Sequence, residues 1–113
     1  MHELSVAMGI VRIAETETSK AGAREVEAIE LEIGTLAGIE FEALDFVWPM
    51  AVKDTVLERA EKRVDRVQGK ARCMDCDTVF EVSHFYDACP TCHSNLKAIL
   101  QGKELRVKAL EVV

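Results

Sequence analysis

Two Cys-x-x-Cys pairs are the residues of this sequence with the clearest chemistry. Cys73-Met-Asp-Cys76 and Cys89-Pro-Thr-Cys92 are separated by twelve residues. Two such pairs can place four thiolates around one point, and Zn²⁺ favours tetrahedral sulfur coordination at about 2.3 Å. Four thiolates leave no open coordination position. The spacing therefore predicts a structural zinc site with these four cysteines as ligands, rather than a catalytic one.

Two other interpretations of the cysteines carry less support. A redox dithiol needs one Cys-x-x-Cys, normally after a strand and at a helix start, and two pairs in a polar segment fit that pattern poorly. A zinc ribbon that binds nucleic acid is common as a class. However, residues 69–97 hold three basic and four acidic side chains, before a tetrathiolate adds two negative charges. A phosphate backbone would not favour this surface, so we expect no nucleic-acid partner.

The residues that follow each cysteine pair are Asp77 and His93, where glycine is often found because the turn can require a positive φ. Aspartate and histidine are among the few other residues that tolerate the left-handed region. We therefore predict that both knuckles still form. We interpret His93 as a turn residue, and His84, which lies between the pairs, as a surface residue.

The chain begins Met1-His2-Glu3, which places an imidazole and a carboxylate beside the amino terminus. Taken alone, His2 and Glu3 are most simply solvated residues ahead of a helix. The alternative is a metal site that uses the terminus itself. The rest of the sequence has to decide between the two.

Composition limits the class of protein. The 113 residues suffice for one compact unit, or for one domain with a small appendage. No stretch approaches the roughly 20 apolar residues that span a bilayer, and the start lacks the basic region of a signal peptide. We therefore expect a cytoplasmic chain without a membrane partner, in which cysteines are ligands rather than disulfides. The net charge of −6 argues against a general nucleic-acid binder.

Apolar periodicity predicts the secondary structure. We expect helices over residues 4–20 and 40–52, and strands over residues 25–34, 61–68 and 104–112. The first helix has apolar residues nearly all round and should be well buried. Pro49 should kink or end the second helix early, because it lacks a backbone donor and clashes with the preceding turn. Thr55 and Glu58 have capping-box spacing and predict a further short helical turn.

This order of elements predicts an α+β fold: a small mixed three-stranded sheet with two helices, interrupted by the cysteine segment. The segment at 70–98 would be an inserted zinc-ribbon-like domain, and residues 1–69 and 99–113 would form the discontinuous main domain. A segment of this size should not build an apolar core of its own, so a metal would supply its stability.

The combination of motifs resembles the HypA/HybF family of nickel metallochaperones, which assist maturation of [NiFe] hydrogenases. The similarity lies in MHELS at the start, ELEIGTLAGIE after the first strand, CMDC and CPTC, and ELRVKALEV at the end, so it covers essentially the whole chain. The resemblance implies a nickel-binding domain and a zinc domain. It implies His2 as a nickel ligand with Glu3 beside it, and the four cysteines as zinc ligands. The missing knuckle glycines and Pro49 depart from the family pattern.

The resemblance also implies function and partners. The family delivers Ni²⁺ to the large subunit of [NiFe] hydrogenase together with a GTPase of the HypB type. In some organisms it also serves urease, which adds urease maturation factors as partners. The sequence has no nucleophile–base pattern, phosphate loop or paired catalytic carboxylates, so we do not expect an enzyme. The alternative function is a zinc-stabilised protein-interaction adaptor with an inert terminus.

The amino terminus suits nickel for a chemical reason. The amine of Met1 and the backbone nitrogen of His2 close a five-membered chelate ring, and that nitrogen and the His2 imidazole close a six-membered one. Three nitrogens then bind in the nearly planar arrangement that nitrogen-bound Ni²⁺ takes. The fourth ligand is open among Glu3, another carboxylate, a histidine of the zinc segment and water.

Overall fold

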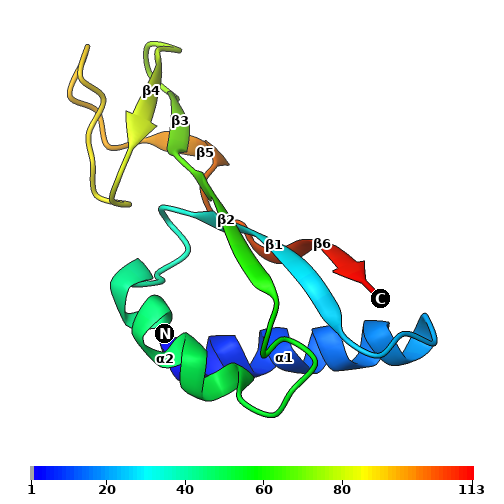
Figure 1. The fold of residues 1–113 in the computed structure, drawn as a ribbon. Helices are drawn as coiled ribbons and strands as arrows, with labels where there is room; N and C mark the ends of the chain where they lie inside the picture. The colour runs from blue at the N-terminus through cyan, green and yellow to red at the C-terminus, as the bar shows by residue number, and fades with distance from the viewer. Residues whose placement is uncertain (1) are drawn as a thin grey trace. The chain divides into compact units, whose positions relative to one another are not determined.

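The computed structural model describes residues 2–113, which form two helices and six strands (Figure 1). In chain order these are α1 (Glu3–Lys20), β1 (Val26–Gly34), α2 (Phe41–Val52), β2 (Glu61–Val67), β3 (Gly69–Cys73), β4 (Val79–Val82), β5 (Lys97–Gln101) and β6 (Leu105–Val112). The two helices and the three strands predicted outside the cysteine segment are confirmed, and so is the α+β class. Within residues 2–113, neither helix is long and apolar enough to cross a membrane.

The first sheet has the strand order β2-β1-β6, so β1 is central. At one end of β1, Arg24 donates its N–H to the carbonyl of Val113, and at the other end Gly34 donates to the carbonyl of Glu104. As β1 advances, its partner β6 therefore runs backwards, and these two strands are antiparallel.

The other side of β1 pairs in the opposite sense. Val26 donates its N–H to Val56, just ahead of β2, and Thr35 donates to Val67 at the end of β2. Both strands thus advance together, which makes β1 and β2 parallel. The sheet is mixed, as predicted. Figure 1 shows both helices on one face of it.

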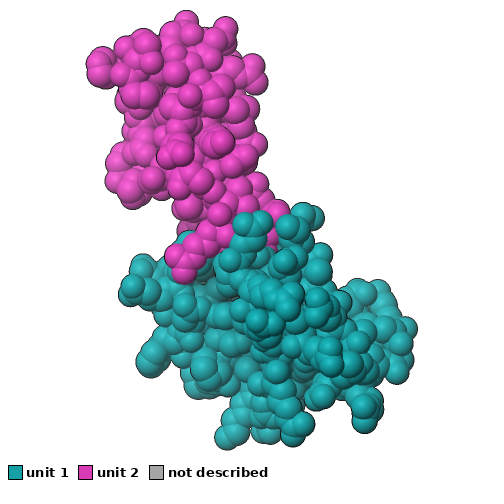
Figure 2. Space-filling model, turned by 45° about the horizontal axis from the view of Figure 1, so that its top comes forward, with its two compact units in different colours: residues 1–31, 39–65, 106–113 teal, residues 32–38, 66–105 magenta. Residues whose placement is uncertain are grey.

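The chain packs as two compact units, coloured separately in Figure 2. Residues 1–31, 39–65 and 106–113 form one of them, which we call the helical unit. Residues 32–38 and 66–105 form the other, which we call the cysteine unit because it contains all four cysteines.

The core of the helical unit lies between the helices and the sheet. Helix α1 buries a stripe at helical spacing, namely Ala7, Ile10, Val11, Ala14 and Thr18. Helix α2 buries Leu44 and Trp48, and β1 buries Ile29 and Leu31 on one face. The expectation that α1 is buried nearly all round is wrong. Ile13 is 48% exposed, because the sheet and α2 cover one stripe of the helix and leave its flanks open.

Helix α2 accommodates Pro49. The helix continues from Pro49 to Val52, so the proline does not end it early. The predicted helical turn after it is wrong, because residues 53–59 form turns and bends instead. Thr55 Oγ1 accepts the Leu57 N–H at 3.1 Å and donates to the Val52 carbonyl at 2.7 Å, so the hydroxyl closes a turn rather than capping a helix.

The cysteine unit contains a second sheet that the sequence did not predict. Its strand order is β4-β3-β5, with β3 antiparallel to both neighbours. The expectation that this segment lacks an apolar core is also wrong. A buried cluster lies on one face of the sheet, with Ile99 packed against it: Leu36, Ala71, Cys73, Phe80, Val82 and Cys89. Five of these six residues lie within the predicted segment at 70–98, and Leu36 comes from outside it. The prediction rested on the small size of the segment, which did not prevent it from burying an apolar cluster.

Two glycines allow backbone segments of the cysteine unit to touch. A Cβ on Gly34 would lie 1.9 Å from the carbonyl oxygen of Gly102. A Cβ on Gly102 would lie 2.6 Å from the Cα of Gly69, and Gly102 has a φ of 119°. No L side chain fits at either position without moving the backbone.

Candidate metal centres

The four cysteine sulfurs form one cluster. Sγ of Cys73 lies 3.5 Å from Sγ of Cys92, and Sγ of Cys76 lies 3.6 Å from Sγ of Cys89. All four sulfurs lie within 4.8 Å of one another. A tetrahedron with metal–sulfur bonds of about 2.3 Å has edges of about 3.8 Å, whereas a disulfide needs about 2.05 Å. The spacing fits four free thiolates around one metal ion.

The backbone of the first knuckle positions its sulfurs. Asp77 donates its N–H to the Cys73 carbonyl at 3.0 Å, and Cys73 donates to the Thr78 carbonyl at 2.8 Å. This closed turn requires a φ of 64° at Asp77. The prediction that a positive φ would fall on the residue after the pair is confirmed.

The second knuckle repeats this pattern sixteen residues later. His93 donates its N–H to the Cys89 carbonyl at 2.8 Å, Cys89 donates to the Ser94 carbonyl at 2.9 Å, and φ at His93 is 63°. His93 is exposed and is a turn residue, as interpreted from the sequence. The two knuckles are therefore equivalent pieces of backbone that face a shared centre.

Two hydroxyl residues beside the cluster were missed by the sequence analysis. Thr78 Oγ1 lies 3.2 Å from Sγ of Cys76. Ser94 Oγ donates to the carboxylate of Asp75 and accepts the Leu96 N–H at 3.1 Å, which ties the second knuckle to the first. A signal was present in the sequence, because each hydroxyl residue stands two positions after the second cysteine of its pair.

The electrostatics of the cluster favour a bound cation. The Thr78 hydroxyl and N–H stabilise the thiolate of Cys76 and lower its pKa to about 6. The N–H of Ser94 acts the same way on Cys92, but the sulfurs of the other three cysteines and desolvation outweigh it and raise the pKa of Cys92 to about 12. Four thiolates at this spacing repel one another, and a metal dication removes that repulsion.

The amino-terminal residues lie apart from any such cluster. Met1 falls outside the described residues. His2 is exposed and occupies the N-cap position of α1 with an extended backbone, at φ −84° and ψ 116°. Among residues 2–113, the one group of three or more potential metal-ligating side chains at ligand distance is the four cysteines, so neither His2 nor Glu3 belongs to such a group.

Glu3 makes a contact that the sequence did not predict. Its Oε2 accepts the backbone N–H of Glu40 at 3.1 Å, and Glu40 is the N-cap residue of α2. This hydrogen bond lowers the pKa of the Glu3 carboxyl below its ordinary value. Glu40 makes no capping bond with its own side chain, so Glu3 reaches from α1 to the start of α2.

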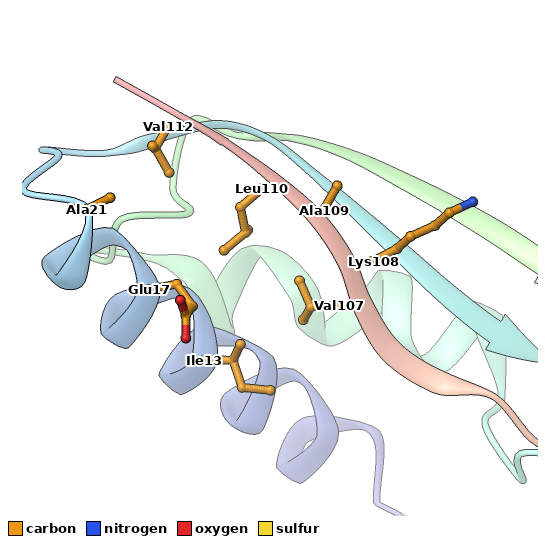
Figure 3. A pocket seen from close by; sticks show the side chains of 8 residues that line it. All are labelled: Ile13, Glu17, Ala21, Val107, Lys108, Ala109, Leu110 and Val112. Atoms are coloured by element: carbon orange, nitrogen blue, oxygen red, sulfur yellow. The ribbon is translucent and has the colours of Figure 1, made fainter.

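A groove of the helical unit offers no metal chemistry. It has a volume of about 460 Å³ and lies between α1 and β6 (Figure 3). Val107, Leu110 and Ile13 point into it. None of the predicted metal ligands lines the groove.

Comparison with known proteins agrees with this geometry. A family model described as "Hydrogenase/urease nickel incorporation, metallochaperone, hypA" matches residues 1–112. The chain belongs to the HypA family. The resemblance inferred from MHELS, the cysteine pairs and ELRVKALEV is confirmed.

Individual relatives of the HypA family match along their whole length. The hydrogenase maturation factor HypA of Parabacteroides distasonis is 43% identical over 112 residues, which cover 99% of this chain and 97% of that protein. HypA of Geotalea uraniireducens is also 43% identical, with 99% of both chains covered. The solution structure of the nickel metallochaperone HypA from Helicobacter pylori superposes with a TM-score of 0.69 at 26% identity, covering 100% of this chain and 98% of that one.

Membership in the HypA family places the chain among metallochaperones that act in hydrogenase maturation and nickel incorporation, rather than among enzymes named for a reaction. The four-cysteine cluster is a site within this chain that could hold a metal ion. The family's cargo is nickel by its description.

Proposed function

We propose that this chain is a nickel carrier that binds Ni²⁺ at its amino terminus and delivers it during maturation of [NiFe] hydrogenase. The ligands are the amine of Met1, the backbone nitrogen and imidazole of His2, and the carboxylate of Glu3. The chain has no catalytic activity of its own. It acts in the cytoplasm, where the unfinished hydrogenase large subunit is its target.

The placement of His2 supports this proposal. The His2 carbonyl accepts the N–H of Val6 at 3.1 Å, so this residue is anchored to the first turn of α1. The backbone nitrogen of an N-cap residue has no acceptor within its helix. The His2 side chain is exposed as well. A chelate through both nitrogens therefore requires no helical hydrogen bond to break.

We propose that the four cysteines hold a structural Zn²⁺. Their number, their softness and the near-tetrahedral spacing of the sulfurs fit this ion. Bound zinc would stabilise the cysteine unit by removing repulsion among the thiolates. The cysteine unit is then the zinc-binding part of the chain, and the helical unit is the nickel-binding part.

The proposed partners follow from the family. Delivery requires the large subunit of [NiFe] hydrogenase as acceptor and a GTPase of the HypB type as helper, with urease maturation factors as further partners where urease is present. A site at a chain end suits such transfer, because it is exposed and can pass its ion by ligand exchange. Protons compete with nickel for the same nitrogens.

The amino terminus can be tested with two changes that spare the fold. His2→Ala removes the imidazole, and a Gly-Ser extension before Met1 converts the amine into an amide, which is a far poorer donor at neutral pH. We expect each change to weaken nickel binding at least about 100-fold, or about 2.7 kcal/mol. Isothermal titration calorimetry on untagged and extended protein measures this.

The control is zinc content, which both variants should keep at the wild-type level, because the cysteines are unchanged. Nickel absorption spectra of the wild type should show a planar nitrogen-rich site. If the extended protein bound nickel as tightly as the native one, the terminus would not be a ligand, and a zinc-stabilised adaptor would become the better description of the chain.

A further inference from the structure

The loop from Ser83 to Asp87 in the cysteine unit exposes aromatic side chains. Phe85 is 53% exposed and Tyr86 is 76% exposed. The whole chain has six Phe, Trp and Tyr residues, and two of them are adjacent here. Large rings left in water cost free energy unless a partner covers them, and aromatic residues are enriched where proteins bind one another.

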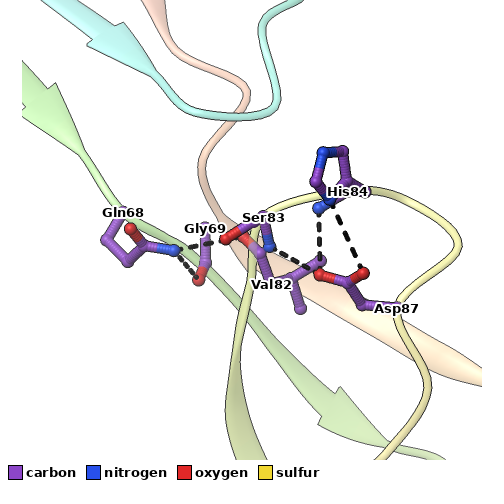
Figure 4. Close-up of polar contacts among 6 residues, drawn as sticks. All are labelled: Gln68, Gly69, Val82, Ser83, His84 and Asp87. Carbon is purple, nitrogen blue, oxygen red and sulfur yellow. Dashed lines mark hydrogen bonds and ion pairs between the residues drawn. The ribbon is translucent and has the colours of Figure 1, made fainter.

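The loop is held in one conformation by its own polar groups (Figure 4). Oδ2 of Asp87 accepts the Ser83 N–H at 2.8 Å and the His84 N–H at 3.0 Å, and the Asp87 N–H donates to the His84 carbonyl at 3.0 Å. These N–H groups hold the pKa of the Asp87 carboxyl below its ordinary value. The carboxylate is therefore engaged within the loop.

The rings also contact neighbouring side chains. The His84 ring stacks on the Tyr86 ring with centroids 4.9 Å apart and an interplanar angle of 14°. The Lys103 ammonium lies 5.9 Å from the centroid of the Phe85 ring. A surface ordered before binding loses less conformational entropy when a partner arrives, which favours recognition.

The loop forms one wall of a pocket of about 280 Å³. The loop contributes Ser83, His84, Phe85 and Tyr86 to its lining, and the other lining residues are Thr35, Leu36 and Gly38. None of these lining residues carries a carboxylate, and the ring of one of them, Phe85, has the Lys103 ammonium beside it. The pocket can therefore take an apolar side chain, with a positive charge at its rim.

We propose that this aromatic loop binds an extended segment of a partner protein that carries an apolar side chain next to a carboxylate. The apolar side chain fills the pocket against Leu36 and Phe85. The carboxylate pairs with Lys103, which complements the charge that the pocket presents. The loop is thus a protein-recognition site separate from the cysteine cluster.

A nucleic acid fits this surface less well, although exposed rings can stack on bases. The cysteine unit has five basic and six acidic side chains, and four thiolates with a divalent metal add two negative charges. A partner that supplies its own carboxylate needs one local cation, and the rim provides it.

The proposal can be tested by selection from a random ten-residue peptide display library on the full-length protein loaded with one equivalent of zinc. A Phe85→Ser, Tyr86→Ser double variant serves as the counter-selection target. We expect wild-type-specific peptides that have a large apolar residue within two positions of Asp or Glu. Enrichment of basic peptides, or no wild-type-specific enrichment, would overturn the proposal.

Fluorescence anisotropy with an enriched peptide then locates its site. Phe85→Ala and Lys103→Glu should each weaken binding at least tenfold. Leu100→Ala is the matched control, because it removes a side chain that is 48% exposed elsewhere in the same unit, and it should leave binding unchanged. Equal weakening by Leu100→Ala, or displacement of the peptide by single-stranded oligouridylate, would refute the assignment.

The same samples separate this proposal from the nickel function. Zinc content and nickel binding should remain at the wild-type level in the Phe85 and Lys103 variants, because neither residue is a proposed metal ligand. A chain that failed to bind nickel could still bind the peptide, and the reverse also holds. If the Phe85→Ala variant lost zinc, its weaker peptide binding could come from a disturbed fold. The Lys103→Glu variant would then decide, because it changes the charge beside Phe85 and removes no apolar side chain.

Discussion

The carboxylate of Glu3 makes one contact in the structure and is assigned a second by the proposed function, and substitutions at Glu3 can separate the two. The first is the hydrogen bond from the N–H of Glu40, which joins the starts of α1 and α2. The other is the proposed bond to nickel. An amide oxygen in the same place can accept the hydrogen bond but is a poorer nickel ligand. Glu3→Gln therefore weakens the proposed nickel bond and keeps the hydrogen bond, whereas Glu3→Ala removes both.

We expect Glu3→Gln to weaken nickel binding several-fold and to keep most of the thermal stability. Glu3→Ala should weaken nickel binding and also lower the thermal stability.

The pKa of Glu3 is lowered in the folded protein by the Glu40 N–H, so its ionised form stabilises the fold. This stabilisation is present above the unfolded pKa, and it is lost as the pH falls through the folded pKa. The difference in Tm between wild type and Glu3→Gln should therefore be largest near neutrality and vanish at strongly acidic pH. A Tm of Glu3→Ala equal to that of Glu3→Gln would contradict the hydrogen bond's role.

The residues after the cysteine pairs offer a second test at this scale. Asp77 has a φ of 64°, a conformation that glycine adopts freely and that a β-branched residue resists. Asp77→Gly should keep zinc affinity at or above wild type, and Asp77→Val should destabilise the knuckle by on the order of 1–2 kcal/mol. Competition with a chromogenic chelator measures both.

The control for the Asp77 variants is Met74→Val, which introduces the same side chain at an exposed position of the knuckle that does not have a positive φ. It should change zinc affinity little. If Asp77→Val bound zinc as tightly as Asp77→Gly, the positive φ would not constrain this turn.

At the scale of elements, the sequence predicted the individual helices and strands whose residues show a clear periodicity. The stripe from Ala7 to Thr18 and the alternation of Ile29, Leu31 and Ile33 each identify an element by themselves. The partners of those elements did not follow from the pattern. The hydrogen bond from the Glu40 N–H to the Glu3 carboxylate joins residues 37 positions apart, and no local sequence pattern near either residue predicts it.

The second sheet was missed for a related reason. Strand β4 has four residues and β3 and β5 have five each, which is too short for a reliable alternation. Their apolar cluster is completed by Leu36, which lies more than thirty positions ahead of most of it. The cysteines could be predicted as a set, because their spacing is itself the signal. The roles of Thr78 and Ser94 could have been predicted only by aligning the sequences of the two knuckles, which places both hydroxyl residues at the same position.

Gly102 gives an element-scale prediction for this second sheet. Gly102→Ala places a Cβ 2.6 Å from the Cα of Gly69 at a φ of 119°, so the end of β5 must shift. We expect a loss of unfolding free energy of at least about 1–3 kcal/mol, concentrated in the cysteine unit. Chemical denaturation with hydrogen exchange measures it.

Gly9→Ala is the matched control for this change, because a Cβ at Gly9 meets nothing within 4 Å. In the interior of α1 it should stabilise the protein by about 0.5–1 kcal/mol through helix propensity. A Gly102→Ala protein as stable as the wild type would show that the close approach of these backbones does not matter to the fold.

At the scale of the whole molecule, the two units should differ in what stabilises them. The helical unit buries an apolar core of ordinary kind, which includes Ile10, Ile29 and Trp48. The cysteine unit buries a smaller cluster, in which Cys73 and Cys89 are themselves members. Its stability should therefore depend on the charge state of the sulfurs and on the metal, whereas the helical unit should not.

Acidification should consequently remove the two metals in order and unfold the units separately. Nickel should leave first, because protons compete with it for its nitrogen ligands. Zinc leaves at lower pH, since metal-bound thiolates resist protonation. As zinc leaves, amides of the cysteine unit such as those of Ala71 and Phe80 should lose protection from hydrogen exchange. Amides of Ile10 and Leu44 in the helical unit should keep it.

The measurement is a pH titration of protein loaded with both metals, with released ions read by separate indicators and amide exchange followed by mass spectrometry. A Cys92→Ser variant at neutral pH supplies the comparison, because it weakens the metal site without acid. It should show the same local loss of protection in the cysteine unit and a helical unit that still unfolds cooperatively on heating. Protection lost at once throughout the chain, in acid and in the variant, would mean that the helical unit depends on the metal as well. In that case the four sulfurs would stabilise the entire protein, and nickel binding at His2 should fail together with zinc rather than before it.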